Sequence, residues 1–261
     1  MTDTQQITQT DVRRWPDTLT DAGKSYAVAE RTTMQIFHFV IDTALHMDGM
    51  RVIAKRALDG ESSLEKPPKE VALLYPGPSL NFLRNVRQDL LEMIFIRLVD
   101  NFTTYLSDLL RLVLVAKPEM LRSREEVKLD YVLKFSSIEE LTSDLIDRKV
   151  TDLSYLGLKE LVSWIEERMG FRLEKHELFD SIVEVIETRN VITHARGVIG
   201  KKYTRTVLHP KFQVGEKRVL EVDDLSNTAD NLRNIVLELD CLAGDKYGIR
   251  SSQPQQDNRI V

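Results

Sequence analysis

Residues 90–115 form the stretch that most constrains how this chain can fold. Apolar side chains dominate it and recur at every third or fourth position, for example at Ile94, Leu98, Tyr105, Leu109 and Leu112. This recurrence has the period of an α-helix and not the two-residue alternation of a half-buried β-strand. A helix with so much apolar surface has to be covered by other elements, so we expect residues 90–115 to form the centre of the core.

Helical patterns flank this stretch on both sides. Residues 22–58 repeat their apolar side chains at helical spacing and predict one long helix, or two helices separated near Gly49. The core helix is predicted to start at Ser79, whose side chain can cap it, and to run to Lys117 before Pro118. The remaining helices are predicted over residues 137–147, 155–169, 174–196 and 223–242.

These elements predict an all-α helical bundle. The one exception is residues 217–222, where a weak alternation predicts a short β element. The chain divides into a flexible arm at 1–20, a long helix and loop at 21–78, a main helical domain at 79–245 and a disordered tail at 246–261. The internal boundary rests on the glycine and the prolines between residues 60 and 78.

Composition limits the class of protein. The chain has 261 residues, of which 42% are hydrophobic and 30% are charged, as in an ordinary globular protein. Its net charge of −5 does not suit adhesion of the whole chain to nucleic acid or to an anionic membrane. Cys241 is the only cysteine, which excludes an intramolecular disulfide and a multi-thiolate metal site. With no long apolar run and no signal-peptide pattern, we expect a cytoplasmic protein without a membrane partner.

The sequence RNVITH, from Arg189 to His194, lies at the predicted end of a helix. Its Arg-to-His spacing is weak evidence alone, because Arg31 and His38 form a second pair of this kind. Asn190, however, adds a hydrogen-bonding side chain one helical turn before the histidine. A helix end that opens onto a loop is also a place where a substrate can approach. We therefore take the second pair, with Asn190, as the candidate site.

The charge around this motif is unusual for an acidic protein. Residues 188–215 contain six basic side chains and not one Asp or Glu, which suits contact with a polyanion. Tyr203 lies within this stretch and either stacks on a nucleic-acid base or packs on the domain. The candidate RNA-binding residues are Arg196, Lys201, Lys202, Tyr203 and Arg205. The alternative for the basic residues is an ordinary solvated loop.

The stretch from Arg189 to Tyr203 resembles the signature of the HEPN superfamily, in which an Arg and a following polar residue precede a His by four to six residues. The similarity is to the RiboL-PSP type and covers roughly residues 80–245. It includes the YLSDLL pattern at residues 105–110 and the closing helix at 223–242. The nucleotidyltransferase-paired branch carries a Tyr two residues after the His, whereas this chain has Arg196.

The resemblance implies an RNA endonuclease that needs neither a metal ion nor a cofactor. The 2′-hydroxyl attacks the adjacent phosphodiester and leaves a 2′,3′-cyclic phosphate and a 5′-hydroxyl. His194 can serve as general base or acid near neutral pH. Arg189 can donate to the extra negative charge of the phosphorane, and Asn190 can orient the imidazole or hold a phosphate oxygen.

The resemblance also implies partners. One helix supplies a single His, so family members dimerise and place two motif helices across a shared cleft, and we expect the same homodimer here. A toxin–antitoxin or anti-phage defence setting, with an antitoxin or other regulatory protein as a partner, follows from the family as well. The substrate that it implies is RNA.

Other interpretations remain open. The chain could be a non-catalytic module that binds RNA or a nucleotide through the same groove. It could also be an interaction protein whose long N-terminal helix pairs with a separate effector. At the residue level, His194 could simply interact with the helix dipole, and Arg189 could form a surface ion pair with Glu184 or Glu187.

Overall fold

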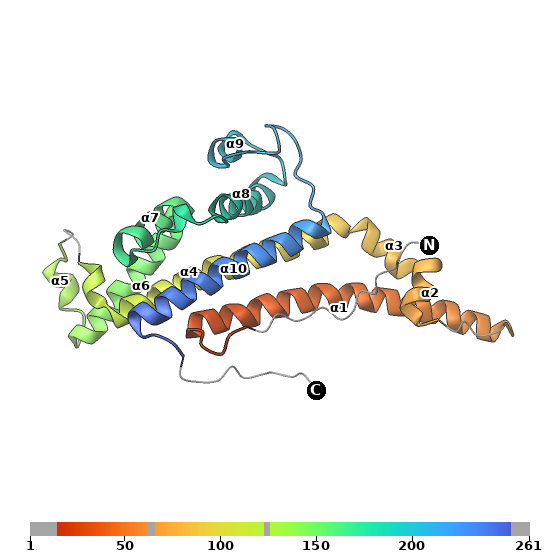
Figure 1. The fold of residues 1–261 in the computed structure, drawn as a ribbon, viewed down its shortest axis with the longest axis horizontal. Coiled ribbons are helices and arrows are strands. Elements are labelled where there is room, and N and C mark those ends of the chain that lie inside the picture. The colour runs from red at the N-terminus through yellow and green to blue at the C-terminus, as the bar shows by residue number, and fades with distance from the viewer. Residues whose placement is uncertain (1–14, 62–65, 123–125, 252–261) are drawn as a thin grey trace.

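The computed structural model describes residues 15–61, 66–122 and 126–251 (Figure 1). Within these ranges the chain is all-α, as predicted, and its β pairing consists of two isolated bridges. The α-helices are α1 (Asp21–Leu58), α2 (Pro68–Leu74), α3 (Pro78–Asn85), α4 (Arg87–Ala116), α5 (Leu129–Val132), α6 (Ile138–Leu156), α7 (Leu158–Met169), α8 (Phe179–Ala195), α9 (Lys201–Thr206) and α10 (Val222–Tyr247). Two short 3₁₀ turns are η1 (Pro118–Leu121) and η2 (Leu173–Lys175).

Helix α4 lies at the centre of the bundle, which confirms the prediction for residues 90–115. It runs beside α10, with α1 along one side of this pair and α7 and α8 on the other (Figure 1). Leu98, Val113 and Leu114 of α4 have no exposed surface. Removal of this apolar surface from water is the main driving force for the bundle.

Helix α1 is continuous, so the two-helix alternative near Gly49 is wrong. Gly49 instead lets α2 approach, because a Cβ at this position would lie 1.8 Å from the carbonyl oxygen of Pro68. Helix α2 itself corrects the expectation of a plain loop over residues 60–78. A proline at the first position of a helix loses no intrahelical hydrogen bond, so the prolines that suggested a loop begin helices here.

Helix α3 is capped from another element, which corrects the expectation that Ser79 caps a helix running to residue 117. The carboxylate of Asp48, on α1, accepts from the amides of Gly77 (2.9 Å), Ser79 (3.1 Å) and Leu80 (2.8 Å). Asp48, and not Ser79, is therefore the residue that caps this helix. The expected single helix is also divided, since the backbone leaves helical geometry at Val86 between α3 and α4.

The two ends of the described chain are joined, which corrects the predicted arm and tail where they are visible. Trp15 and Leu19 are buried in the main core, so residues 15–20 are not a loose arm. Thr20 donates through its amide to Oδ2 of Asp240 (2.7 Å) and through its hydroxyl to Oδ1 (2.6 Å). Arg250 forms a β-bridge with Thr20, so residues 246–251 are ordered parts of the fold. Residues 1–14 and 252–261 lie outside the described ranges.

The remaining helices differ from expectation mainly at their ends. The helix predicted over residues 137–147 is α6, which the side chain of Ser137 caps and which continues to Leu156. Helix α7 starts at Leu158 and ends at Met169, and the following Gly170 takes the left-handed conformation that glycine adopts without strain. Residues 217–222 make one bridge, between Lys217 and Val198, so the expected β element is not a strand.

Candidate functional site

Helix α8 carries the RNVITH motif, and two of its faces are buried. Ile182, Val185 and Ile192 pack into the main core that α4 and α10 build. On another side, Val191 packs into a small second core with residues of α9 and its flanks, namely Ile199, Tyr203 and Val207. These two contacts hold α8 firmly between the bundle and α9.

The rest of α8 forms an open face at its C-terminal end. At 100° per residue, Ile186, Arg189, Asn190, Thr193 and His194 fall on one side of the helix. Thr193 and His194 are exposed, and the other three are half-buried. We call these five residues the open face of α8. The structure therefore brings Arg189, Asn190 and His194 onto one surface that solvent reaches.

Arg189 is held by a residue that the sequence did not single out. Its Nε and Nη2 donate to Oδ1 of Asp100, on α4, at 3.0 and 2.8 Å, and its Nη1 lies 3.5 Å from Oδ1 of Asn190. The expected alternative partners, Glu184 and Glu187, do not pair with it. A guanidinium has five N–H donors, and these contacts use three, so two N–H groups stay available to a ligand.

His194 lies in the last turn of α8 and is exposed. No hydrogen bond joins its ring to any residue that the structure describes. The helix ends just beyond it, where Arg196 adopts a left-handed conformation (φ 50°) and the Gly197 amide donates to the carbonyl of Val191 (3.1 Å). The imidazole is thus accessible to a ligand on the open face.

The basic residues of the stretch 188–215 differ in their exposure and in their partners. Arg196, Lys201 and Arg205 are exposed and can contact a polyanion. The side chain of Lys202 is 75% exposed, and its Nζ lies 3.3 Å from Oε1 of Glu187. The fold therefore places a carboxylate from outside residues 188–215, that of Glu187, next to a basic residue of this stretch.

Tyr203 does not belong to this exposed surface. Its ring is 1% exposed within the second core, and its hydroxyl donates to Glu184 (3.4 Å). Burial and the nearby Glu184 carboxylate raise the pKa of Tyr203 above its ordinary value. The expectation that Tyr203 stacks on a base is therefore wrong, and its packing alternative holds.

A hollow of about 230 Å³ adjoins the open face. Its walls are residues 157–160 at the start of α7, Val183, Ile186 and Glu187 of α8, and Lys202 and Thr206 of α9. Ile186 belongs both to this hollow and to the open face, so the two are continuous. We call it the α7–α9 hollow.

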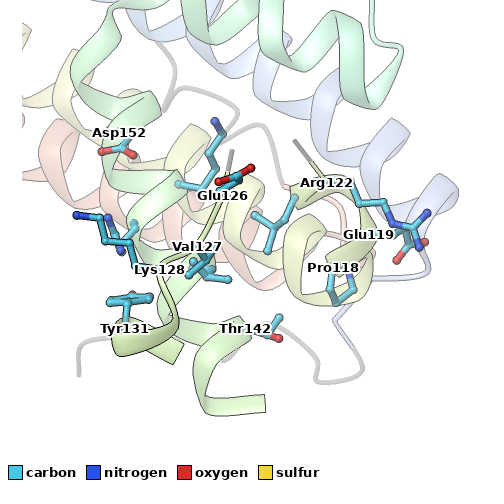
Figure 2. Close-up of a pocket in the computed structure, with 13 residues that line it drawn as sticks. Pro118, Glu119, Arg122, Glu126, Val127, Lys128, Tyr131, Thr142 and Asp152 are labelled. Carbon is cyan, nitrogen blue, oxygen red and sulfur yellow. The ribbon is translucent and has the colours of Figure 1, made fainter. Parts of the chain in front are cut away.

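A wider hollow of about 730 Å³ lies elsewhere, between η1, α5 and α6 (Figure 2). Its walls mix basic side chains with the carboxylates of Glu119, Glu126 and Asp152, which Figure 2 shows around the same space as Arg122 and Lys128. This mixture does not favour a polyanion, and no motif residue reaches it. The open face of α8 remains the candidate site.

Three further observations concern the rest of the described chain. In the described part of the chain, no three His, Cys, Asp or Glu side chains are grouped so that they could hold a metal ion. None of the described helices has the length and apolar character needed to span a membrane. The second Arg–His pair, Arg31 and His38, lies in the middle of α1 and not at a helix end.

No family model matches this chain, and neither a curated protein nor a solved structure matches it.

Proposed function

We propose that this chain is a metal-independent RNA endonuclease of the HEPN type. The observation that carries the proposal is the meeting of Arg189, Asn190 and His194 on the open face of α8, beside exposed basic residues. The resemblance of the motif to the HEPN signature and the all-α bundle both support it. The expected products are a 2′,3′-cyclic phosphate and a 5′-hydroxyl.

The proposed reaction assigns a role to each motif residue. An imidazole nitrogen of His194 accepts the proton of the 2′-hydroxyl while O2′ bonds to phosphorus, and the bond from phosphorus to O5′ then breaks. The free N–H groups of Arg189 donate to the non-bridging oxygens, which carry more charge in the phosphorane than in the substrate. Asn190 holds a phosphate oxygen or the imidazole from one turn earlier on the helix.

Asp100 acts on this site through Arg189. Its carboxylate fixes the guanidinium across from α4, and a fixed donor costs less entropy when the transition state forms. The ion pair also removes most of the long-range charge of Arg189. Attraction of the RNA is therefore assigned to Arg196, Lys201 and Arg205, which are exposed.

The leaving O5′ needs a proton, and one His per chain cannot supply both transfers at once. We propose that a second copy provides it, with two open faces lining one cleft in a two-fold homodimer. A cytoplasmic toxin–antitoxin or anti-phage role, with a regulatory protein as a further partner, belongs to the same proposal. Its support is the resemblance alone.

A non-catalytic RNA- or nucleotide-binding module is the second candidate. The observation that favours it is the Arg189–Asp100 ion pair, which already occupies part of the guanidinium. An interaction protein is the third, because α1 exposes Ile36 (53%), Phe39 (70%) and Met47 (58%) to solvent. Both candidates predict that no RNA is cut.

Cleavage of a defined RNA by the purified chain in excess EDTA tests the proposal. The expected result is a cyclic-phosphate product in the wild type and little product in His194→Ala and Arg189→Ala. His38→Ala is the matched control, since it removes the exposed His of the other Arg–His pair and should cut normally. No cleavage by the wild type, a requirement for Mg²⁺, or equal cleavage by His194→Ala would contradict the proposal. Mass measurement in solution tests the dimer.

A further inference from the structure

The α7–α9 hollow has the dimensions of a subsite for one base. At about 230 Å³ it is smaller than the roughly 300–1,000 Å³ that drug-sized ligands occupy, but it has room for a planar nucleobase. Leu158, Val183 and Ile186 supply apolar walls against which a flat ring can lie. Lys159 and Lys202 stand beside it with positive charge, and Glu160 is the exposed carboxylate of the same rim.

Glu187 is a buried carboxylate with spare acceptor capacity. Its side chain is only 10% exposed, and the Nζ of Lys202 at 3.3 Å is its one partner among the described residues. An ionised carboxylate has about four acceptor positions, and buried polar groups are normally satisfied. Lys202 is itself mostly in solvent, so it holds Glu187 loosely. The carboxylate is ready to accept from a ligand inside the hollow.

The helix places this carboxylate in line with the motif. Glu187, Asn190 and His194 stand at positions i, i+3 and i+7, which share one side of an α-helix. Seven residues at 1.5 Å each separate Glu187 from His194 by about 10 Å along the axis. A nucleotide whose base enters the hollow therefore directs its phosphodiester toward Asn190 and His194. Arg189 lies further round the helix, toward α4, where it pairs with Asp100.

We propose that the α7–α9 hollow is a base subsite that selects guanine through the carboxylate of Glu187. The inference rests on the proposed nuclease function and names the RNA that the enzyme would prefer. Guanine presents two adjacent donors, N1–H and the 2-amino group, which match the two oxygens of a carboxylate as an arginine fork does. Adenine and cytosine present one amino donor beside an acceptor, and the N3–H of uracil lies between two carbonyls. Each of these would place an oxygen or nitrogen lone pair against Glu187.

Binding of mononucleotides tests this subsite without any cleavage. Titration of the wild-type chain with GMP, AMP, CMP and UMP should show GMP binding at least about tenfold more tightly, as expected for one bidentate pair. Glu187→Gln should lose that preference, because its amide turns a donor toward the guanine amino group. Glu160→Gln is the matched control, which removes a carboxylate from the same rim and should keep the preference. Equal binding of all four, or none at millimolar concentration, would overturn the inference whether or not the variants fold.

Cleavage mapping separates this inference from the nuclease proposal. A wild type that cuts next to guanine, and a Glu187→Gln variant that cuts at redistributed sites, would support both. Selective GMP binding by a wild type that cuts no RNA would retain the subsite and reject the nuclease. Cleavage without any guanine preference would retain the nuclease and overturn the subsite. His194→Ala should still prefer GMP, since it leaves the hollow intact.

Discussion

Carboxylates in two regions of this molecule are engaged very differently. In the framework of α1, α3 and α10, Asp240 accepts two hydrogen bonds from Thr20, and Asp48 accepts three from backbone amides. On α8, Glu187 has one partner among the described residues, Lys202, which is mostly exposed. Burial does not separate the two regions, because Glu187 is buried as well. What differs is the number of hydrogen-bond donors that each carboxylate receives. A carboxylate with several donors holds the fold, whereas a buried carboxylate with one donor keeps acceptor positions for a ligand.

If the region around α8 serves a ligand and not the fold, removal of His194 should affect activity and leave stability unchanged. The substitution His194→Ala should lower the cleavage rate by about 10²–10⁴-fold, the usual contribution of a general acid or base. Its free energy of unfolding should change by less than about 0.5 kcal/mol, because the side chain is exposed and makes no hydrogen bond within the described chain. Initial rates and urea unfolding measure both. A large loss of stability would place His194 in the framework instead.

Asp240→Ala should do the opposite. It leaves the buried amide and hydroxyl of Thr20 without acceptors, so we expect a loss of about 3 kcal/mol in the free energy of unfolding. Cleavage per folded molecule should stay at the wild-type level. Urea unfolding followed by circular dichroism is the measurement, and a loss below about 1 kcal/mol would show that Asp240 is not a framework residue.

Gly49→Ala tests the contact of α1 with α2. The new methyl group would collide with the carbonyl of Pro68, so α2 has to move, at a cost of about 2 kcal/mol. Gly200→Ala is the control, because nothing lies within 4 Å of the added carbon there. Thermal unfolding of both variants should separate them clearly, and equal melting temperatures would contradict the close approach.

Asp100→Asn sharpens the comparison, since Asp100 is assigned to the site and not to the framework. We expect kcat to fall about tenfold with KM little changed. The reason is that the fixed position of the guanidinium matters only for the contacts it makes in the transition state. Stability should change by less than about 1 kcal/mol, because this ion pair is partly exposed. Asp100→Glu should restore part of kcat. A change confined to KM would instead assign Asp100 to substrate binding.

The smallest effect concerns pH. Burial raises the pKa of Asp48, but the hydrogen bonds from the amides of Leu80, Ser79 and Gly77 lower it by more. The pKa of Asp48 therefore lies below its ordinary value. A carboxylate with a lowered pKa stabilises the folded state above its unfolded pKa, near 4, and loses this contribution as the pH falls through the folded value. Wild type should therefore lose more stability than Asp48→Asn between pH 5 and pH 2. Parallel slopes in urea unfolding would contradict this.

The sequence predicts those parts of the fold that depend on local pattern. The period of its apolar residues predicts that α4 forms the centre of the core. The cap that Asp48 provides and the Arg189–Asp100 pair join residues that are 29 to 89 positions apart. No local pattern encodes such pairs, because they depend on how whole helices pack.

Tyr203 shows a different kind of error. Its neighbours Lys201, Lys202 and Arg205 suggested an exposed surface. The spacing of Ile199, Tyr203 and Val207 is that of one helix face, and it contained the signal that the ring is buried. Of the three, only Tyr203 lies within α9, and Ile199 and Val207 flank it, so the four-residue spacing indicates burial here beyond the ends of the helix.

The bond between Thr20 and Asp240 also sets an order of events during synthesis. The two residues are 220 positions apart, so at 5–20 residues per second the start of α1 leaves the ribosome on the order of ten seconds or more before its partner exists. Helix α8 is complete before α10, against which it packs. A nascent chain therefore has only the α4 side of the support for the motif helix until α10 has been synthesised.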